Sequence, residues 1–284
     1  MKSKSLPVWD LSEYYKNEED KNIDKDLNSY QKKAKEFAKN YRGRLNKLGA
    51  EEFLKALKEL EILSNLSSKL SGFAYLYQTT QMKNPKATAL YQKIIERLNT
   101  AGTDLLFFGL EYNKLSKAEE KKLLENKKIQ TYLPYLKRMR RFKPYELKED
   151  VEKALLEKDI TSGSAWVRLY EEYAARLEYV IDGKKYNDAE ISKLCLSSDA
   201  QLREKSGKEM NRVSKENSFV ISYIYNMIIK DKAVEDEKRG FKLPMSARNL
   251  SEDVSDETVQ VLAQTVRDNY KILLGVFISL RPNS

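Results

Sequence analysis

Residues 132–186 read YLPYLKRMRRFKPYELKEDVEKALLEKDITSGSAWVRLYEEYAARLEYVIDGKKY. Pro144 lacks the backbone N–H that a continuing helix needs, and it favours an extended conformation at Lys143. The apolar residues that follow recur at helical spacing and predict an amphipathic helix: Leu147, Val151, Ala154, Leu155 and Leu156. Ser162-Gly163-Ser164 would end this helix, and either serine is suited to cap the next one.

The next helix is predicted to carry one wide apolar stripe. Its members are Trp166, Leu169, Tyr170, Tyr173, Ala174 and Leu177. Asp182-Gly183 then follows Tyr179-Val180-Ile181, and this dipeptide suits the two central positions of a type I′ turn. The stretch therefore predicts two amphipathic helices that lead into one small β-hairpin.

Three long helices are predicted on the N-terminal side of this stretch. The first has apolar residues every three or four positions from Ile23 to Tyr41, and the second runs from about Ala50 to Tyr77. Asn84-Pro85 opens the third, which we expect to continue to Tyr112. Because the connecting loops are short, these helices are predicted to form an antiparallel bundle.

Further helices are predicted on both sides of the hairpin. Capping boxes are recognised at Ser116-x-x-Glu119, Asn187-x-x-Glu190 and Ser198-x-x-Gln201. The last of them opens a long helix predicted over residues 198–230, an irregular stretch follows to about Leu250, and Ser255 caps a final helix. The fold class is therefore mostly α, a multi-helix antiparallel bundle with one small β-hairpin near 179–186.

Composition fits a helix-rich chain with a sizeable core. Of 284 residues, 41% are hydrophobic and 33% are charged, with only 10 Gly and 6 Pro. The single cysteine, Cys195, excludes an internal disulfide and fits a reducing cytoplasm. Since no apolar run reaches the length of a signal peptide or a bilayer span, we expect a cytoplasmic protein that does not contact membranes.

The segment RRFKPYELKEDVEKALLEKDITSGSAWVRLYEE, followed by the DG hairpin, resembles the N-terminal region of oligoendopeptidase F. This family belongs to the thimet-oligopeptidase-like zinc metallopeptidases. Further matching segments are WDLSEYY (9–15), LLFFGLE (105–111), KDKAVEDEKRGF (230–241) and SARNLSEDV (246–254). The resemblance rests on their order and spacing, and it runs from about residue 9 to about residue 274.

The resemblance implies a division of the chain and a function for the whole enzyme. It implies a long-helix bundle over 1–115, the family's N-terminal helices and hairpin over 116–197, and the start of a truncated catalytic domain over 198–284. In the family these helices and the zinc domain enclose a channel that admits short peptides. We expect this chain to form part of the channel wall.

Zinc binding in the family implies residues that this sequence lacks. The family holds its catalytic zinc on an HExxH helix with a further Glu, and the glutamate of the motif activates water. The sequence contains no histidine. We therefore expect zinc in the full-length enzyme only, no catalytic or metal-binding residue in this chain, and no peptidase activity from it alone.

Four residues are candidates for the substrate channel. Arg248 and Asn249 lie in the stretch expected to be irregular, where they would either line the channel or hold its wall by hydrogen bonds. Tyr223 and Tyr225 lie on the preceding long helix, as core or as cleft wall. Asp231, Glu235, Asp236 and Glu237 are interpreted as a solvated helix end rather than a cation site.

Basic and aromatic residues alternate most densely between Tyr132 and Tyr145. The cations are Lys137, Arg138, Arg140, Arg141 and Lys143. They suit a phosphate-binding stripe with stacking partners, or a solvated helix face with buried aromatic rings, and we favour the second interpretation. With a net charge of +9, a basic helical binding or scaffold module is the alternative function, although nucleic acid is not the expected partner.

The chain closes on an apolar run, Leu273, Leu274, Val276, Phe277 and Ile278. If a catalytic portion is missing, the apolar surface it would cover is exposed on the final helices. We therefore expect self-association, or binding of dyes that report exposed apolar surface, centred on the region after Val259.

Overall fold

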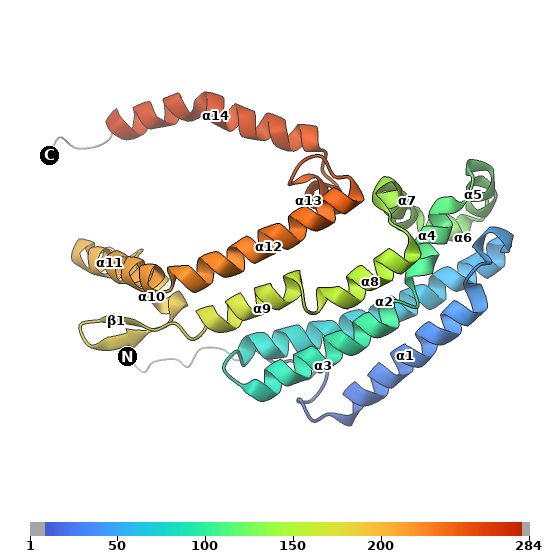
Figure 1. Cartoon of the computed structure of the whole chain (residues 1–284), viewed down its shortest axis with the longest axis horizontal. Helices are drawn as coiled ribbons and strands as arrows, with labels where there is room; N and C mark the ends of the chain where they lie inside the picture. Colours follow the sequence, from blue (N-terminus) through green and yellow to red (C-terminus); the bar gives the residue numbers. More distant parts are fainter. Residues whose placement is uncertain (1–8, 280–284) are drawn as a thin grey trace.

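The computed structural model describes residues 9–279, without the side chains of 273, 274 and 276–279. Figure 1 shows a mostly helical chain with one small hairpin. The elements in chain order are α1 (Lys21–Tyr41), η1 (Leu45–Lys47), α2 (Ala50–Thr80), α3 (Pro85–Gly102), α4 (Leu106–Lys114), α5 (Lys117–Leu124), α6 (Lys127–Gln130), α7 (Leu133–Phe142), η2 (Lys143–Tyr145), α8 (Glu149–Asp159), α9 (Gly163–Ala174), β1 (Tyr179–Ile181), β2 (Lys184–Tyr186), α10 (Asp188–Leu194), α11 (Ala200–Glu216), α12 (Ser218–Arg239), α13 (Ser246–Ser251) and α14 (Asp256–Ser279). The predicted fold class is confirmed.

Helices α1, α2 and α3 lie side by side and contain the main core (Figure 1). All six residues of the predicted α1 stripe, from Ile23 to Tyr41, are buried. At the end nearest α4 the core is aromatic: the Phe108 ring centroid lies 5.8 Å from that of Phe37 and 5.9 Å from that of Phe53. Such ring pairs add to the stabilisation that burial alone provides.

The predicted third helix is interrupted, so the expectation of one helix to Tyr112 was wrong. Helix α3 ends at Gly102, and α4 begins at Leu106. A tight turn between them is closed by the Leu105 N–H, which donates to the Gly102 carbonyl at 2.9 Å. The Asp104 carbonyl, freed by the break, accepts from the Arg42 guanidinium at 3.3 Å. This long-range hydrogen bond satisfies the carbonyl that the interruption leaves free. It could not be predicted from the spacing of apolar residues along the helix.

The bend at Pro144 takes a different form from the one predicted. Lys143 has φ −46° and ψ −43°, so it is helical rather than extended, and η2 follows α7 without a gap. Pro144 is tolerated because it lies in the first turn of η2, where its missing N–H would have no intrahelical partner. The chain turns after Tyr145 instead, where Glu146 is extended.

A distant carboxylate meets the first residue of α9. Ser162 occupies the N-cap position, but its side chain makes no capping hydrogen bond. The Gly163 N–H instead donates to the Asp231 carboxylate of α12, at 3.1 Å. A Cβ atom on Gly163 would lie 2.9 Å from the same oxygen, so this approach favours glycine. The partial positive charge at the N-terminus of α9 attracts the Asp231 carboxylate, and this interaction holds α9 against α12.

The predicted hairpin is confirmed. β1 and β2 pair antiparallel, with Val180 opposite Lys185. Asp182 and Gly183 both have positive φ, 50° and 80°, as a type I′ turn requires.

Replacing Gly183 by valine should destabilise this turn. At φ 80° a β-branched side chain clashes with its own backbone, so we expect Gly183→Val to lower the free energy of unfolding by about 1 kcal/mol or more. Thermal melting measures the effect. Gly207→Val, on α11 at a negative φ and with open space at its Cβ position, is a control for the general cost of valine. Equal melting temperatures for the Gly183→Val variant and the wild type would contradict the prediction.

The helix predicted over 198–230 is also two helices. Asp199, not Ser198, is the N-cap of α11, because its carboxylate accepts the N–H groups of Gln201 and Leu202. Asn217 separates α11 from α12. Its side chain accepts the Tyr173 hydroxyl of α9 at 2.5 Å and donates to the Val213 carbonyl. The break therefore forms around a tertiary contact.

After α13 the chain turns back, and the C-terminal helix α14 runs in roughly the opposite direction to α12 (Figure 1). Its predicted cap is confirmed, since the Thr258 N–H donates to Ser255 Oγ at 3.1 Å. Among residues 9–279 no helix combines the length and the apolar character needed to cross a membrane.

Burial is concentrated in two separate clusters. The larger lies in the N-terminal helices, and the smaller comprises Tyr179, Ile181, Ile191 and Val213 around the hairpin. Helices α8 and α9, which connect these regions, contain no fully buried residue.

Candidate functional site

Arg248 and Asn249 lie on the short helix α13, so the expectation that they belong to an irregular stretch was wrong. Asn249 is buried, and its side-chain amide donates to the Asp256 carboxylate at 2.7 Å. Ser246 donates to the other Asp256 oxygen. These hydrogen bonds lower the pKa of Asp256 and keep it ionised at the start of α14. Arg248 is exposed and pairs with Glu252 one turn later, at 2.8 Å.

A hollow of about 670 Å³ lies between the residues before α13 and the first turns of α14. Asn249 and Asp256 line it together with apolar residues such as Met245 and Val259. Arg248 is not among its lining residues. Of the predicted pair, only Asn249 therefore reaches a concave surface, and there it holds α14 in place.

Tyr223 and Tyr225 are on α12, and both are exposed. The interpretation of these rings as core residues is wrong, since 50% of Tyr223 and 62% of Tyr225 is accessible. The Tyr223 ring meets Trp166 of α9 edge-on, with centroids 5.8 Å apart. Because fourteen residues of helix, about 20 Å, separate Tyr225 from the end of α12, the four predicted residues do not form one cluster.

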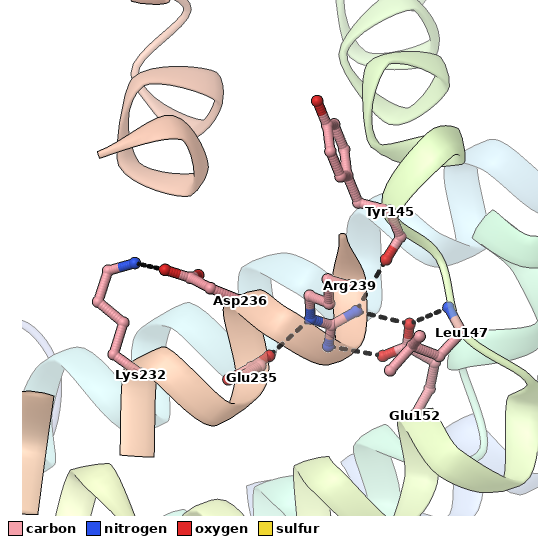
Figure 2. A network of polar contacts seen from close by, with 7 residues as sticks. All are labelled: Tyr145, Leu147, Glu152, Lys232, Glu235, Asp236 and Arg239. Atoms are coloured by element: carbon pink, nitrogen blue, oxygen red, sulfur yellow. Dashed lines mark hydrogen bonds and ion pairs between the residues drawn. The ribbon is translucent and has the colours of Figure 1, made fainter. Parts of the chain in front are cut away.

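The most connected polar group in this region surrounds Arg239, at the C-terminal end of α12 (Figure 2). Its guanidinium binds both carboxylate oxygens of Glu152, at 2.8 and 2.9 Å, and also Glu235 at 2.7 Å. It donates further to the Tyr145 carbonyl at 3.2 Å. The Tyr145 ring stacks on Phe241, with centroids 4.0 Å apart. This group fixes the end of α12 against η2 and α8.

Burial and hydrogen bonding act in opposite directions on the pKa values of the glutamates in and beside this group. Burial acts to raise the pKa of Glu152, but hydrogen bonds from Arg239 and from the Leu147 N–H outweigh it and hold that pKa below its usual value. The bond to Glu152 in turn raises the pKa of Arg239. Nearby Glu146 behaves oppositely: burial raises its pKa, and the hydrogen bond from Asn113 only partly opposes this. Both shifts favour the charged forms of Arg239 and Glu152, which form an ion pair with a structural role.

Three of the four acidic residues of α12 make contacts within the protein. Asp231 accepts the Gly163 N–H. Glu235 pairs with Arg239, and Asp236 pairs with Lys232 (Figure 2). Over residues 9–279 no three carboxylate or thiol groups lie close enough to share a metal ion. With no histidine in the sequence, this donor set does not fit a catalytic zinc, and we derive no catalytic step from these residues.

The basic stretch divides between two surroundings. Arg140 turns toward the core, where it donates to the carbonyls of Asn113 and Leu115 at 2.7 and 3.0 Å. Its guanidinium also lies over the Tyr112 ring, 4.8 Å from the centroid. Arg138 and Arg141 instead reach the α13–α14 connection, at the Ser251 carbonyl and at Asp253.

Sequence reasoning missed the residues that organise this region: Glu152, Arg239, Ser246 and Asp256. Glu152 follows Val151 of the predicted apolar stripe, and Arg239 directly precedes the left-handed Gly240 that ends α12. The sequence does show a charged residue beside an apolar stripe and a basic residue at the end of a helix. Neither feature indicates which residue the charged side chain will contact.

Comparison with known proteins agrees with this architecture. The profile of the family described as Oligopeptidase F matches residues 111–179, which confirms the resemblance in the stretch where it was recognised. A crystal structure of oligoendopeptidase-F from Enterococcus faecium superposes with a TM-score of 0.78 at 17% identity, covering 87% of this chain and 50% of that one. A candidate peptidase from Chlamydophila abortus gives 0.58 at 17% identity, covering 95% and 46%.

The chain thus spans about half the length of the solved structures it matches. A comparison with curated proteins found no match. The family profile and the superposition together support the interpretation of this chain as the N-terminal portion of a peptidase of the oligoendopeptidase F type.

Proposed function

We propose that this chain is the N-terminal part of a zinc-dependent oligoendopeptidase of the cytoplasm, where it forms a wall of the channel that admits short peptides. The observation that carries the proposal is the exposed apolar surface of α12 and α14. Phe219, Tyr225 and Ile229 on α12, and Leu262, Val266 and Tyr270 on α14, are all exposed. Helices with so much exposed apolar area usually pack against another portion of protein.

The catalytic zinc of the whole enzyme is proposed to lie outside these 284 residues, since the donors here do not suit it. Leu262, Val266 and Tyr270 recur every four residues and form one stripe of α14. The same stripe would support self-association when the partner portion is absent. The sequence analysis also assigned to this apolar surface five residues whose side chains lie outside the described part of the structure: Leu273, Leu274, Val276, Phe277 and Ile278.

The purified chain should not cleave peptides. Because it has no histidine to hold zinc, we expect no chelator-sensitive hydrolysis when it is incubated with zinc and a fluorescence-quenched peptide. A full-length oligoendopeptidase in the same assay is the positive control. Cleavage by the purified chain that a chelator abolishes would contradict the proposed division of labour.

The positive half of the proposal is tested on the coding DNA after codon 284. We expect an HExxH codon run there, and co-expression of that region with this chain should give peptide hydrolysis that the chain alone lacks. If no reading frame there encodes HExxH, the peptidase proposal fails. A basic helical binding module would then be the better description.

A further inference from the structure

The basic stretch of α7 contains a charge arrangement that the peptidase proposal leaves unused. Arg140 is directed into the core. Pro134, Lys137, Arg138 and Arg141 recur at intervals of three or four residues, so they share a different face of the helix. That face borders the connection between α13 and α14.

These four residues line a hollow of about 710 Å³. Tyr135 and Asp253 also line it, and the Tyr135 ring is exposed. The lining of the hollow therefore combines apolar and aromatic side chains with three cations. Its volume lies within the range usual for small-molecule sites, roughly 300 to 1,000 Å³.

The positive charges of the hollow are only partly neutralised. Asp253 is its single lining carboxylate, and it pairs with Arg141. Arg138 donates to the Ser251 carbonyl at 2.8 Å, a neutral group. Within residues 9–279 no carboxylate lies within ion-pair distance of Arg138 or Lys137. Two cations thus face the hollow without a counter-charge.

We propose that this hollow binds a small ligand in which a doubly charged oxyanion is joined to an apolar body. The oxyanion is a phosphate monoester or a pair of carboxylates, both of which match the forked donors of Arg138 and the point charge of Lys137. The apolar body lies against Pro134 and Tyr135. Nucleic acid fits less well, because the cations converge on one hollow instead of following a backbone.

The site is tested by calorimetric titration of the whole chain. Phenyl phosphate and phenylsuccinate are the two probes, and they distinguish the phosphate from the dicarboxylate source. Inorganic phosphate should bind more weakly than phenyl phosphate, since it offers no apolar surface to the Tyr135 ring. We expect Arg138→Gln to weaken binding of the better probe by about tenfold, because it removes charged hydrogen bonds to the ligand.

Two further variants keep the test decisive. Lys137 makes no ion pair with any residue in the described range 9–279, so Lys137→Gln should fold normally and still weaken binding, even if loss of the Ser251 contact impairs folding of Arg138→Gln. Lys208→Gln removes one exposed charge on α11, far from α7, and should leave binding unchanged (Figure 1).

Three results would overturn the proposal. The first is no heat of binding from either aryl probe at millimolar concentration. The second is an equal loss of affinity in Lys208→Gln and Lys137→Gln, which would mean attraction by net charge alone. The third is tighter, steeply salt-dependent binding of duplex DNA that all variants weaken equally. None of these bears on peptide hydrolysis, so this inference stands or falls separately from the proposed function.

Discussion

Truncating Phe108 to alanine should lower the free energy of unfolding by about 3 to 5 kcal/mol. Phe108 is 1% exposed and lies between the rings of Phe37 and Phe53. Alanine would remove the apolar area that the ring buries and leave a cavity that the packed helices around it can fill only in part. Denaturant unfolding followed by circular dichroism measures the loss.

Phe219→Ala is the matched control for this substitution. Phe219 is 81% exposed on α12, so the same truncation removes almost no buried area and should change stability by less than about 0.5 kcal/mol. Similar losses from the two variants would show that Phe108 does not lie in the core as described.

Replacing Arg239 by alanine should cost about 2 to 4 kcal/mol, because it leaves the Glu152 carboxylate in a poorly solvated position without its partner. Only 19% of the Arg239 side chain and 14% of the Glu152 side chain is exposed. The variant would also lose the bonds to Glu235 and to the Tyr145 carbonyl. Denaturant unfolding again provides the measurement.

Arg248→Ala tests whether burial is the cause. Arg248 also pairs with a carboxylate, that of Glu252, but 67% of the Arg248 side chain and 56% of the Glu252 side chain is exposed. Exposed pairs typically contribute less than about 1 kcal/mol, so this variant should be much less destabilised than Arg239→Ala. If the two arginines proved equally costly to remove, the Arg239 group would not be the fastening inferred from its geometry.

Local periodicity predicted most of the helices, and it was most informative where the apolar stripe faces the main core. The α1 stripe from Ile23 to Tyr41 is the clearest case, and all of it is buried. Turn chemistry was equally informative at Asp182-Gly183, where both required positive φ angles are found. Both predictions rest on residues that are close in sequence to the element they form.

Helix breaks and the polar site could not be predicted in this way. The break after Gly102 and the break at Asn217 are completed by Arg42 and by Tyr173, and each partner is more than forty positions away. Glu152 and Arg239 are 87 positions apart. The pairing of such groups depends on how whole helices pack. The sequence therefore indicated Arg248, Asn249, Tyr223 and Tyr225 as candidates but not the group around Arg239.

The division of burial into two clusters has a consequence for how the chain opens. Since α8 and α9 contain no fully buried residue, little hydrophobic free energy couples the N-terminal bundle to the region around the hairpin. We therefore expect amide protons of α1 and α2 to exchange with solvent far more slowly than those of α8 and α9. Trp166, on α9, would report an earlier transition by fluorescence than circular dichroism reports for the bundle. A substitution in one buried cluster should then lower the free energy of unfolding mainly of the cooperative unit that contains that cluster.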